Sequence, residues 1–168
     1  MNIKRLVNLS AVAALYAIFT IITAPISYMG IQFRFSEILV LLVFFRKDYA
    51  YSIIIGCFIA NLFGPLGVLD ITLGVFQTVV AVFLISISKN LFLSALYPVI
   101  TMPIIAFELH LAINLGLMEP VPFWILVVTT ILGEAVVLLV FGYPIMRMLR
   151  KNEAFLNLID ANRNVEEI

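Results

Sequence analysis

Polar residues interrupt this apolar chain at spacings that could build a binding site for a small molecule. Asp70, Gly74 and Gln77 follow one another at the four- and three-residue steps that place side chains on one face of a helix. A carboxylate accepts hydrogen bonds on two oxygens, and a side-chain amide both donates and accepts. Gly74 leaves a gap between the two polar groups, which a flat ring could approach. This face therefore predicts contact with a ligand that carries N–H donors.

Other residues that are costly to bury in a membrane recur in successive apolar runs, toward what would be the same side of the membrane. Arg34 and Glu37 are three residues apart, whereas Thr130 and Glu134, like His110 and Asn114, are four apart. A charge near the centre of a bilayer costs ~2.5–3.5 kcal/mol on insertion scales, so several charges at one depth need partners. The candidate binding residues are Arg34, Glu37, Asn61, Asp70, Gln77, Glu108, His110 and Glu134.

Each candidate also has a structural explanation. Arg34 and Glu37 could pair with each other, while Asn61 and Asp70 could cap helix ends, a role that Asp fills well. A single histidine such as His110 is more often an interface residue than a ligand. Glu134 is different, because no basic residue lies near it in the sequence, and a buried carboxylate of this kind is a functional candidate by default.

The charges of this set do not balance. Glu37, Asp70, Glu108 and Glu134 face one fixed cation, Arg34. Either a donor-rich, cationic ligand satisfies the excess of acceptors, or burial keeps one or two of the carboxyl groups protonated. The sequence leaves both interpretations open.

Composition defines the class of protein. The chain has 168 residues, of which 64% are hydrophobic and 12% are charged, with a mean hydropathy of +1.16. Soluble domains carry about 45–50% apolar and ~25% charged residues, so we expect an all-α integral membrane protein of one domain. The net charge of zero gives no indication of a nucleic-acid partner. Cys57, the single cysteine, cannot form an internal disulfide.

Six apolar runs are long enough, or nearly so, to cross a hydrocarbon core that needs ~20 helical residues. They cover residues 5–24, 30–46, 49–64, 68–88, 91–114 and 121–147. Residues 1–151 then form a six-helix membrane domain, and residues 152–168 form a polar cytoplasmic tail. The first run is interpreted as a membrane helix and not as a cleaved signal, because Pro25 follows Ala24 and five more runs come after it.

The basic residues set the orientation. If the six runs alternate, only Arg34 falls on the outer side, and every other Lys and Arg falls on the inner side. The positive-inside rule then predicts that both termini are cytoplasmic. The inner residues are Lys4, Arg5, Arg46, Lys47, Lys89, Arg147, Arg150, Lys151 and Arg163.

The second run is short, since uninterrupted apolar sequence covers only Phe35 to Phe45 and contains Glu37. To cross the bilayer, its helix must begin upstream, near residues 28–31, with Arg34 and Glu37 inside the span. A re-entrant hairpin over residues 31–63 is the alternative. The basic turn at Arg46 and Lys47 argues against it.

Several motifs are missing from the sequence. It contains no P-loop, no Cys/His metal pattern and no G-x-S-x-G elbow, so we expect a protein that is not an enzyme and binds no cofactor. A solute-binding protein of this kind would take its energy from a partner. Ala13 and Ala17, with Ser10 and Ala14 beside them, form small-residue pairs that could dock such a partner or pack internally.

Four stretches of the sequence resemble a known family. The stretches "RFSEIL" from Arg34, "GCFIANLFGPLGVLDITLGVFQT" from Gly56, "FELHLAINL" from Phe107 and "GEAVVLLVFGYP" from Gly133 are similar to the substrate-binding S-components of energy-coupling factor transporters, in particular the QueT-type queuosine-precursor group. The alanine pair of the first run is similar to that family's docking motif.

The resemblance implies a function. Such S-components have six helices in the bacterial plasma membrane, bind a solute near the outer face and associate with a transmembrane coupling protein and two cytosolic ATPases. The solute would be a 7-deazaguanine: the aminomethyl or cyano precursor, or queuine. Glu134 or Glu108 would bind the ring edge and Asp70 the amine. Asn61 and Gln77 would complete the hydrogen bonds, and Phe33 or Phe107 would stack on the ring.

Two other functions compete with this one: an S-component for a different vitamin-like or purine-like solute, and a stand-alone permease. A permease would need polar residues through the inner half of the membrane, which the sequence lacks. A purely structural membrane protein would leave the cost of burying Glu134 unexplained.

Overall fold

The computed structural model describes residues 3–24 and 33–161, and within these two ranges the chain is helical, with no β-strand. Its first half comprises α1 (Ile3–Ile22), η1 (Phe35–Leu41), α3 (Leu42–Phe45), α4 (Tyr49–Asn61), η2 (Asp70–Gly74) and α5 (Val75–Ile87). Its second half comprises α6 (Leu91–Thr101), α7 (Pro103–Asn114), α8 (Phe123–Ala135), η3 (Val136–Gly142), α9 (Tyr143–Leu149) and α10 (Glu153–Leu158). The expectation of an all-α protein is therefore confirmed for the described chain.

Four helical stretches are long and apolar enough to cross a membrane: Ile3–Ile22, Asp70–Ile87, Leu91–Asn114 and Phe123–Leu149. Two apolar helices, Phe35–Phe45 and Tyr49–Asn61, are shorter than a full span. Each stretch falls within or close to one of the apolar runs. Helices form there because a backbone in lipid must satisfy its own hydrogen bonds.

Three spans depart from regular α-helical geometry. Pro103 has no N–H to donate, so the helix is interrupted between Thr101, the end of α6, and Pro103, the start of α7. Wider π-helical turns occupy η2, which begins at Asp70, and η3, which begins two residues after Glu134. Such turns are frequent at functional sites, and both adjoin candidate binding residues.

The second apolar run differs from its prediction. Arg34 has a non-helical backbone (φ −92°, ψ 89°), and a 3₁₀ helix begins only at Phe35. Glu37 is thus in the first helical turn, and Arg34 precedes the helix instead of lying within it. The predicted start near residues 28–31 lies outside the described residues.

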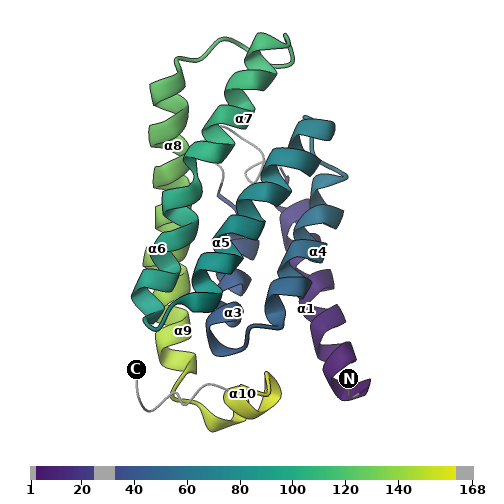
Figure 1. Cartoon of the computed structure of the whole chain (residues 1–168), viewed down its shortest axis with the longest axis vertical. Coiled ribbons are helices and arrows are strands. Elements are labelled where there is room, and N and C mark those ends of the chain that lie inside the picture. The colour runs from purple at the N-terminus through teal and green to yellow at the C-terminus, as the bar shows by residue number, and fades with distance from the viewer. Residues whose placement is uncertain (1–2, 25–32, 162–168) are drawn as a thin grey trace.

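The helices stand side by side in an elongated bundle (Figure 1). Four features share its lower end: the beginning of α1, the α3–α4 turn, the α5–α6 turn and the end of α9. We name this the basic end, because these segments carry Lys4, Arg5, Arg46, Lys47, Lys89, Arg147, Arg150 and Lys151. The α4–η2 turn and the α7–α8 loop lie toward the opposite end.

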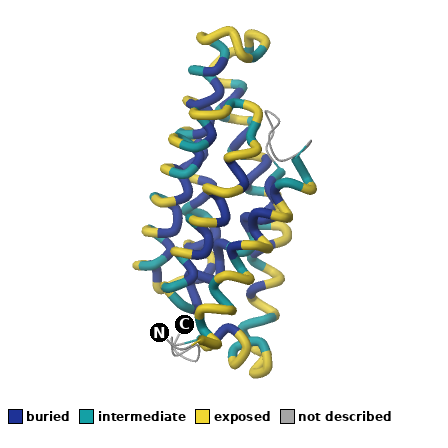
Figure 2. Tube along the Cα trace, turned by 90° about the vertical axis from the view of Figure 1, so that its right-hand side faces the viewer, coloured by how far each residue is buried: buried dark blue, intermediate teal, exposed yellow. Residues whose placement is uncertain are grey.

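Buried and exposed positions are arranged as in a membrane protein. Buried positions line the inside of the bundle and exposed ones its outside (Figure 2). The outside carries large apolar side chains, such as Phe83 at 61% and Ile87 at 57% exposure, which suit contact with lipid. Toward the basic end the interior is an apolar core that includes Phe44, Phe45 and Ile85.

The C-terminal residues fold back onto the basic end. Asn152 caps α10, its side chain accepting a hydrogen bond from the Phe155 amide at 3.1 Å. Phe155 makes an edge contact with Phe45, with ring centroids 5.9 Å apart. The prediction of a polar tail did not include this helix, whose apolar residues reach the core.

Candidate binding site

The candidate site lies between the spans, in the half of the bundle away from the basic end. It is built by α1, η1, α4, η2, α5, α7 and α8. Seven of the eight candidate binding residues are at most 3% exposed and belong to the interior: Arg34, Glu37, Asn61, Asp70, Gln77, Glu108 and Glu134.

Arg34 is the positive centre of this group. It interacts electrostatically with Glu37 of η1 and Glu108 of α7, and its charge also reaches Glu134 of α8. Carboxyl groups from three separate spans therefore share one guanidinium, as the charge excess in the sequence suggested.

Glu37 is held by a residue that the sequence analysis overlooked. The hydroxyl of Tyr16 donates a hydrogen bond to Glu37 Oε1, and one helical turn later the hydroxyls of Thr20 and Ser36 lie 2.6 Å apart. These contacts tie α1 to η1, so Glu37 has a structural partner in addition to Arg34. Tyr16 and Thr20 are four residues apart in an apolar span, and that spacing was the available signal.

Asn61 and Asp70 close the turn between α4 and η2. Asn61 Nδ2 donates to the backbone carbonyl of Asp70 at 2.7 Å, and Asp70 Oδ2 accepts from the Leu66 amide at 2.8 Å. Gly64 lies against the same carboxylate, because an added Cβ would stand 2.7 Å from Asp70 Cγ. Asp70 thus binds the backbone amide of a residue that precedes its own helix, and it does not cap that helix.

Gln77 bridges two spans. Its Nε2 donates to Thr101 Oγ1 at 2.9 Å, and its Oε1 accepts from Thr78 Oγ1 at 3.4 Å. Thr101 ends α6 just before Pro103, so the interruption of this span lies beside the bridge. Both ends of the Gln77 amide are occupied by protein groups.

Three of the seven buried candidates keep acceptors unused. Asn61 Oδ1, Glu108 Oε2 and both carboxyl oxygens of Glu134 have no hydrogen-bond partner among residues 3–24 and 33–161. Gly74 adjoins two of them, since a Cβ there would stand 2.6 Å from Asn61 Nδ2 and 3.7 Å from Glu108 Oε2. Leaving a buried acceptor unsatisfied costs about 1–3 kcal/mol, and more when it is charged. Such a group of atoms is suited to a ligand that brings N–H donors.

Some predicted residues lie elsewhere. His110 is two residues beyond Glu108, so it points to a different side of α7, where its ring meets Phe123 with centroids 5.4 Å apart. Asn114 is exposed. Phe107 is 48% exposed, which does not suit a ring that stacks on a buried ligand, whereas Phe33 is partly buried next to Arg34.

The small residues of α1 serve mainly internal packing. Ala13 and Ala17 are 8% and 4% exposed, and a Cβ on Gly56 of α4 would stand 2.7 Å from the Ala13 carbonyl oxygen. The other pair, Ser10 and Ala14, is exposed. Ser10, Ala14 and Ala13 line a groove of about 430 Å³ between α1 and α4.

Cys57 also belongs to the polar interior. Its Sγ lies 3.1 Å from Thr78 Oγ1 and 3.6 Å from Asn61 Nδ2. Its burial agrees with its interpretation as a small core residue. The described residues place no group of three or more His, Cys, Asp or Glu side chains where it could hold a metal ion.

The described chain is a set of apolar helices that enclose buried polar residues with unused acceptors, an arrangement that suits a membrane protein in contact with a small polar solute. The chain matches the QueT transporter family over residues 6–151 and therefore belongs to that family, which confirms the resemblance noted in the sequence. It is a multi-pass transport protein of the bacterial cell membrane.

A curated relative agrees with this assignment. The "Queuosine precursor transporter QueT" of Lactococcus lactis subsp. cremoris (strain MG1363) is 47% identical over 58 residues, which cover 33% of this chain and 34% of the relative. The chain thus aligns with about a third of that relative's length. No solved structure matches the chain significantly.

Proposed function

We propose that this chain is the S-component of an energy-coupling factor importer and captures a 7-deazaguanine queuosine precursor at the outer face of the membrane. Membership of the QueT transporter family supports this proposal, and so does the name of the Lactococcus relative, a queuosine precursor transporter. The observation that carries it is the set of unused acceptors on Asn61, Glu108 and Glu134 within one buried group.

The chemistry of a 7-deazaguanine suits these acceptors. Its guanine-like edge presents adjacent N–H donors, which one carboxylate can accept as a pair. We assign that edge to Glu134, because both of its oxygens are unused. One oxygen of Asp70 already binds the Leu66 amide, so Glu108 and Asn61 Oδ1 are the better acceptors for an aminomethyl group. Phe33 is the stacking candidate.

This assignment favours the aminomethyl precursor over the cyano form. An ammonium group supplies donors and a positive charge to carboxyl groups that interact with Arg34 and, for Glu108, with Asp70, whereas a nitrile only accepts. Hydrogen bonds to charged groups contribute about 1.5–3 kcal/mol, so we expect at least a tenfold preference (~1.4 kcal/mol).

We further propose a six-span topology with both termini in the cytoplasm. The α3–α4 turn shares the basic end with the beginning of α1 and the α5–α6 turn (Figure 1). This is the arrangement expected if Phe35–Phe45 and Tyr49–Asn61 pair as two crossings and not as a re-entrant hairpin. The positive-inside rule then puts the basic end in the cytoplasm and the binding site toward the outside.

The energy would come from a transmembrane coupling protein and two cytosolic ATPases, and this chain would need no cofactor and catalyse no reaction. The groove beside Ser10 and Ala14 would receive the coupling protein, since small residues let helices approach closely. Ala14→Leu should abolish ATP-dependent uptake in vesicles that contain the whole complex, while the isolated variant binds solute as before.

Binding by the purified chain without ATP tests the solute assignment. Calorimetric titration with the aminomethyl, cyano and queuine forms should give saturable binding, tightest for the aminomethyl form. Glu134→Gln should weaken binding about ten- to a hundredfold, because a charge-assisted pair of hydrogen bonds is lost. Glu119→Gln is the matched control, since Glu119 is an exposed carboxylate of the α7–α8 loop. Absence of binding for all three solutes would refute the assignment.

A further inference from the structure

The C-terminal residues create a second polar site at the basic end. We call Asn152–Ala161 the strap. Asn8 Nδ2 of α1 donates to the Leu158 carbonyl at 3.0 Å, and the Tyr49 hydroxyl of α4 donates to the Ile159 carbonyl at 3.1 Å. The strap therefore joins the beginning of α1 to the beginning of α4.

Packing and an ion pair fix the end of the strap. Ile159 is 6% exposed and belongs to the apolar core. Asp160 adopts a left-handed backbone with φ of 53°, a conformation that Asp tolerates better than most residues. Arg46 Nη1 lies 2.6 Å from Asp160 Oδ2 and also donates to the Asp160 carbonyl. The strap is thus a built part of the fold, although the sequence suggested only a polar tail.

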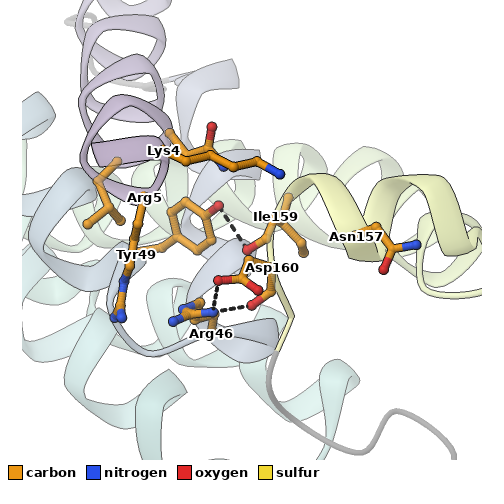
Figure 3. Close-up of a pocket in the computed structure, with 9 residues that line it drawn as sticks. Lys4, Arg5, Arg46, Tyr49, Asn157, Ile159 and Asp160 are labelled. Atoms are coloured by element: carbon orange, nitrogen blue, oxygen red, sulfur yellow. Dashed lines mark hydrogen bonds and ion pairs between the residues drawn. The ribbon is translucent and has the colours of Figure 1, made fainter. Parts of the chain in front are cut away.

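A pocket of about 340 Å³ lies between the strap, the beginning of α1 and the α3–α4 turn. Figure 3 shows side chains from these three separate segments around it. The polar residues that line it are Lys4, Arg5, Asn8, Arg46, Tyr49, Asn157 and Asp160.

The groups of this pocket that have no partner among the described residues are suited to bind an anion. Asp48 pairs with Arg5 and Arg46, and Asp160 pairs with Arg46, so both carboxylates are occupied. Arg5 Nε is buried and has no hydrogen-bond partner in the described part of the chain. Lys4 is exposed and forms no ion pair with a described carboxylate. The remaining groups are thus a cation and an N–H donor.

We propose that this pocket is a phosphate site, which takes the phosphate of an anionic phospholipid headgroup or a soluble phosphate. Arg and Lys are the residues that bind phosphate oxygens, through charge-assisted hydrogen bonds. Under the topology proposed above, on which this inference rests, the pocket lies at the cytoplasmic headgroup layer. Basic pockets between helices on that side bind anionic headgroups.

Native mass spectrometry of the full chain tests the proposal, with phosphatidylglycerol in one arm and phosphatidylcholine in the other. We expect preferential retention of phosphatidylglycerol. Lys4→Gln should lower the bound fraction about fivefold, because a basic residue at an anionic surface contributes ~1 kcal/mol. Arg5→Gln should lower it as well. Lys89→Gln is the matched control, since Lys89 is exposed at the same end and does not line the pocket.

A second arm separates the two sources of phosphate. If inorganic phosphate raises the melting temperature of the wild type but not of Lys4→Gln, and phosphatidylglycerol shows no preference, the site takes a soluble phosphate. Equal retention of both lipids with no stabilisation by phosphate would overturn the proposal, as would a preference for phosphatidylglycerol that is unchanged in both Lys4→Gln and Arg5→Gln. Deazaguanine titration of the same variants reports on the solute site alone, so the two proposals can fail separately.

Discussion

Gly74 of η2 lies so close to Asn61 of α4 that a Cβ on Gly74 would stand 2.6 Å from Asn61 Nδ2. The same amide nitrogen donates to the Asp70 carbonyl at 2.7 Å. Because Gly74 has no side chain, Asn61 can close the α4–η2 turn through its Nδ2. Asn61 Oδ1 has no hydrogen-bond partner among the described residues. The gap that the sequence suggested for a flat ring is occupied at least in part by this amide.

Gly74→Ala should displace Asn61 and weaken deazaguanine binding about fivefold or more, because overpacking a filled interior costs roughly 1–3 kcal/mol. Calorimetric titration measures the affinity, and a thermal melt measures the stability. The control is Gly142→Ala, where the nearest atoms would lie at 3.3 Å and belong to the flexible ends of Leu138 and Leu41. Unchanged affinity in Gly74→Ala would show that Asn61 does not need its present position.

Tyr16→Phe should lower the melting temperature of the detergent-solubilised chain. The change removes the hydroxyl that donates to Glu37 and leaves a buried carboxyl oxygen without that donor, at a cost of ~1–3 kcal/mol. Tyr51→Phe provides the comparison, because Tyr51 is 68% exposed. Equal melting temperatures for the two variants would mean that the contact contributes nothing to stability.

Asp70 can be tested for two separate roles. Asp70→Ala removes the acceptor of the Leu66 amide, so hydrogen exchange over residues 62–69 should become faster. Asp70→Asn keeps an acceptor and should retain most of the protection. If Asp70 only positions this turn, Asp70→Asn should bind solute within about threefold of the wild type. A much larger loss in Asp70→Asn would instead assign the charge to the ligand.

Single-cysteine labelling tests the topology. Cys57 is fully buried and should stay silent, so a membrane-impermeant maleimide reports only on the introduced thiol. Glu119→Cys in the α7–α8 loop should react in intact cells. Lys89→Cys in the α5–α6 turn should react only after permeabilisation. Labelling of both variants in intact cells would contradict the proposed orientation.

The sequence predicted the helical fold, with four helices that are long enough to cross a membrane, and the burial of seven polar residues, because both follow from the cost of polar groups in lipid. It could not predict local geometry. The 3₁₀ helix that begins at Phe35, and the π-helical turns at Asp70 and after Glu134, depend on packing between spans. The depth of a residue along a span does not say which face of the helix it occupies. His110 and Glu108 lie at similar depths, and the sequence therefore grouped them although they face different sides of α7.

Tyr16 and the strap were missed for related reasons. Tyrosine is counted with the hydrophobic residues in the composition, so composition does not mark the phenol that holds Glu37, and only its four-residue spacing from Thr20 does. The residues after Arg150 are polar overall, yet Phe155 and Ile159 reach the core. A segment this short offers too few turns for a periodic apolar pattern to be recognised.

The most direct measurement is an experimental structure of the chain with the aminomethyl 7-deazaguanine bound. We predict the N–H donors of the ring edge within about 2.7–3.2 Å of the Glu134 carboxyl oxygens, with the aminomethyl nitrogen beside Glu108 and Asn61 Oδ1. A ligand bound elsewhere, with the Glu134 oxygens still without a donor, would contradict the account.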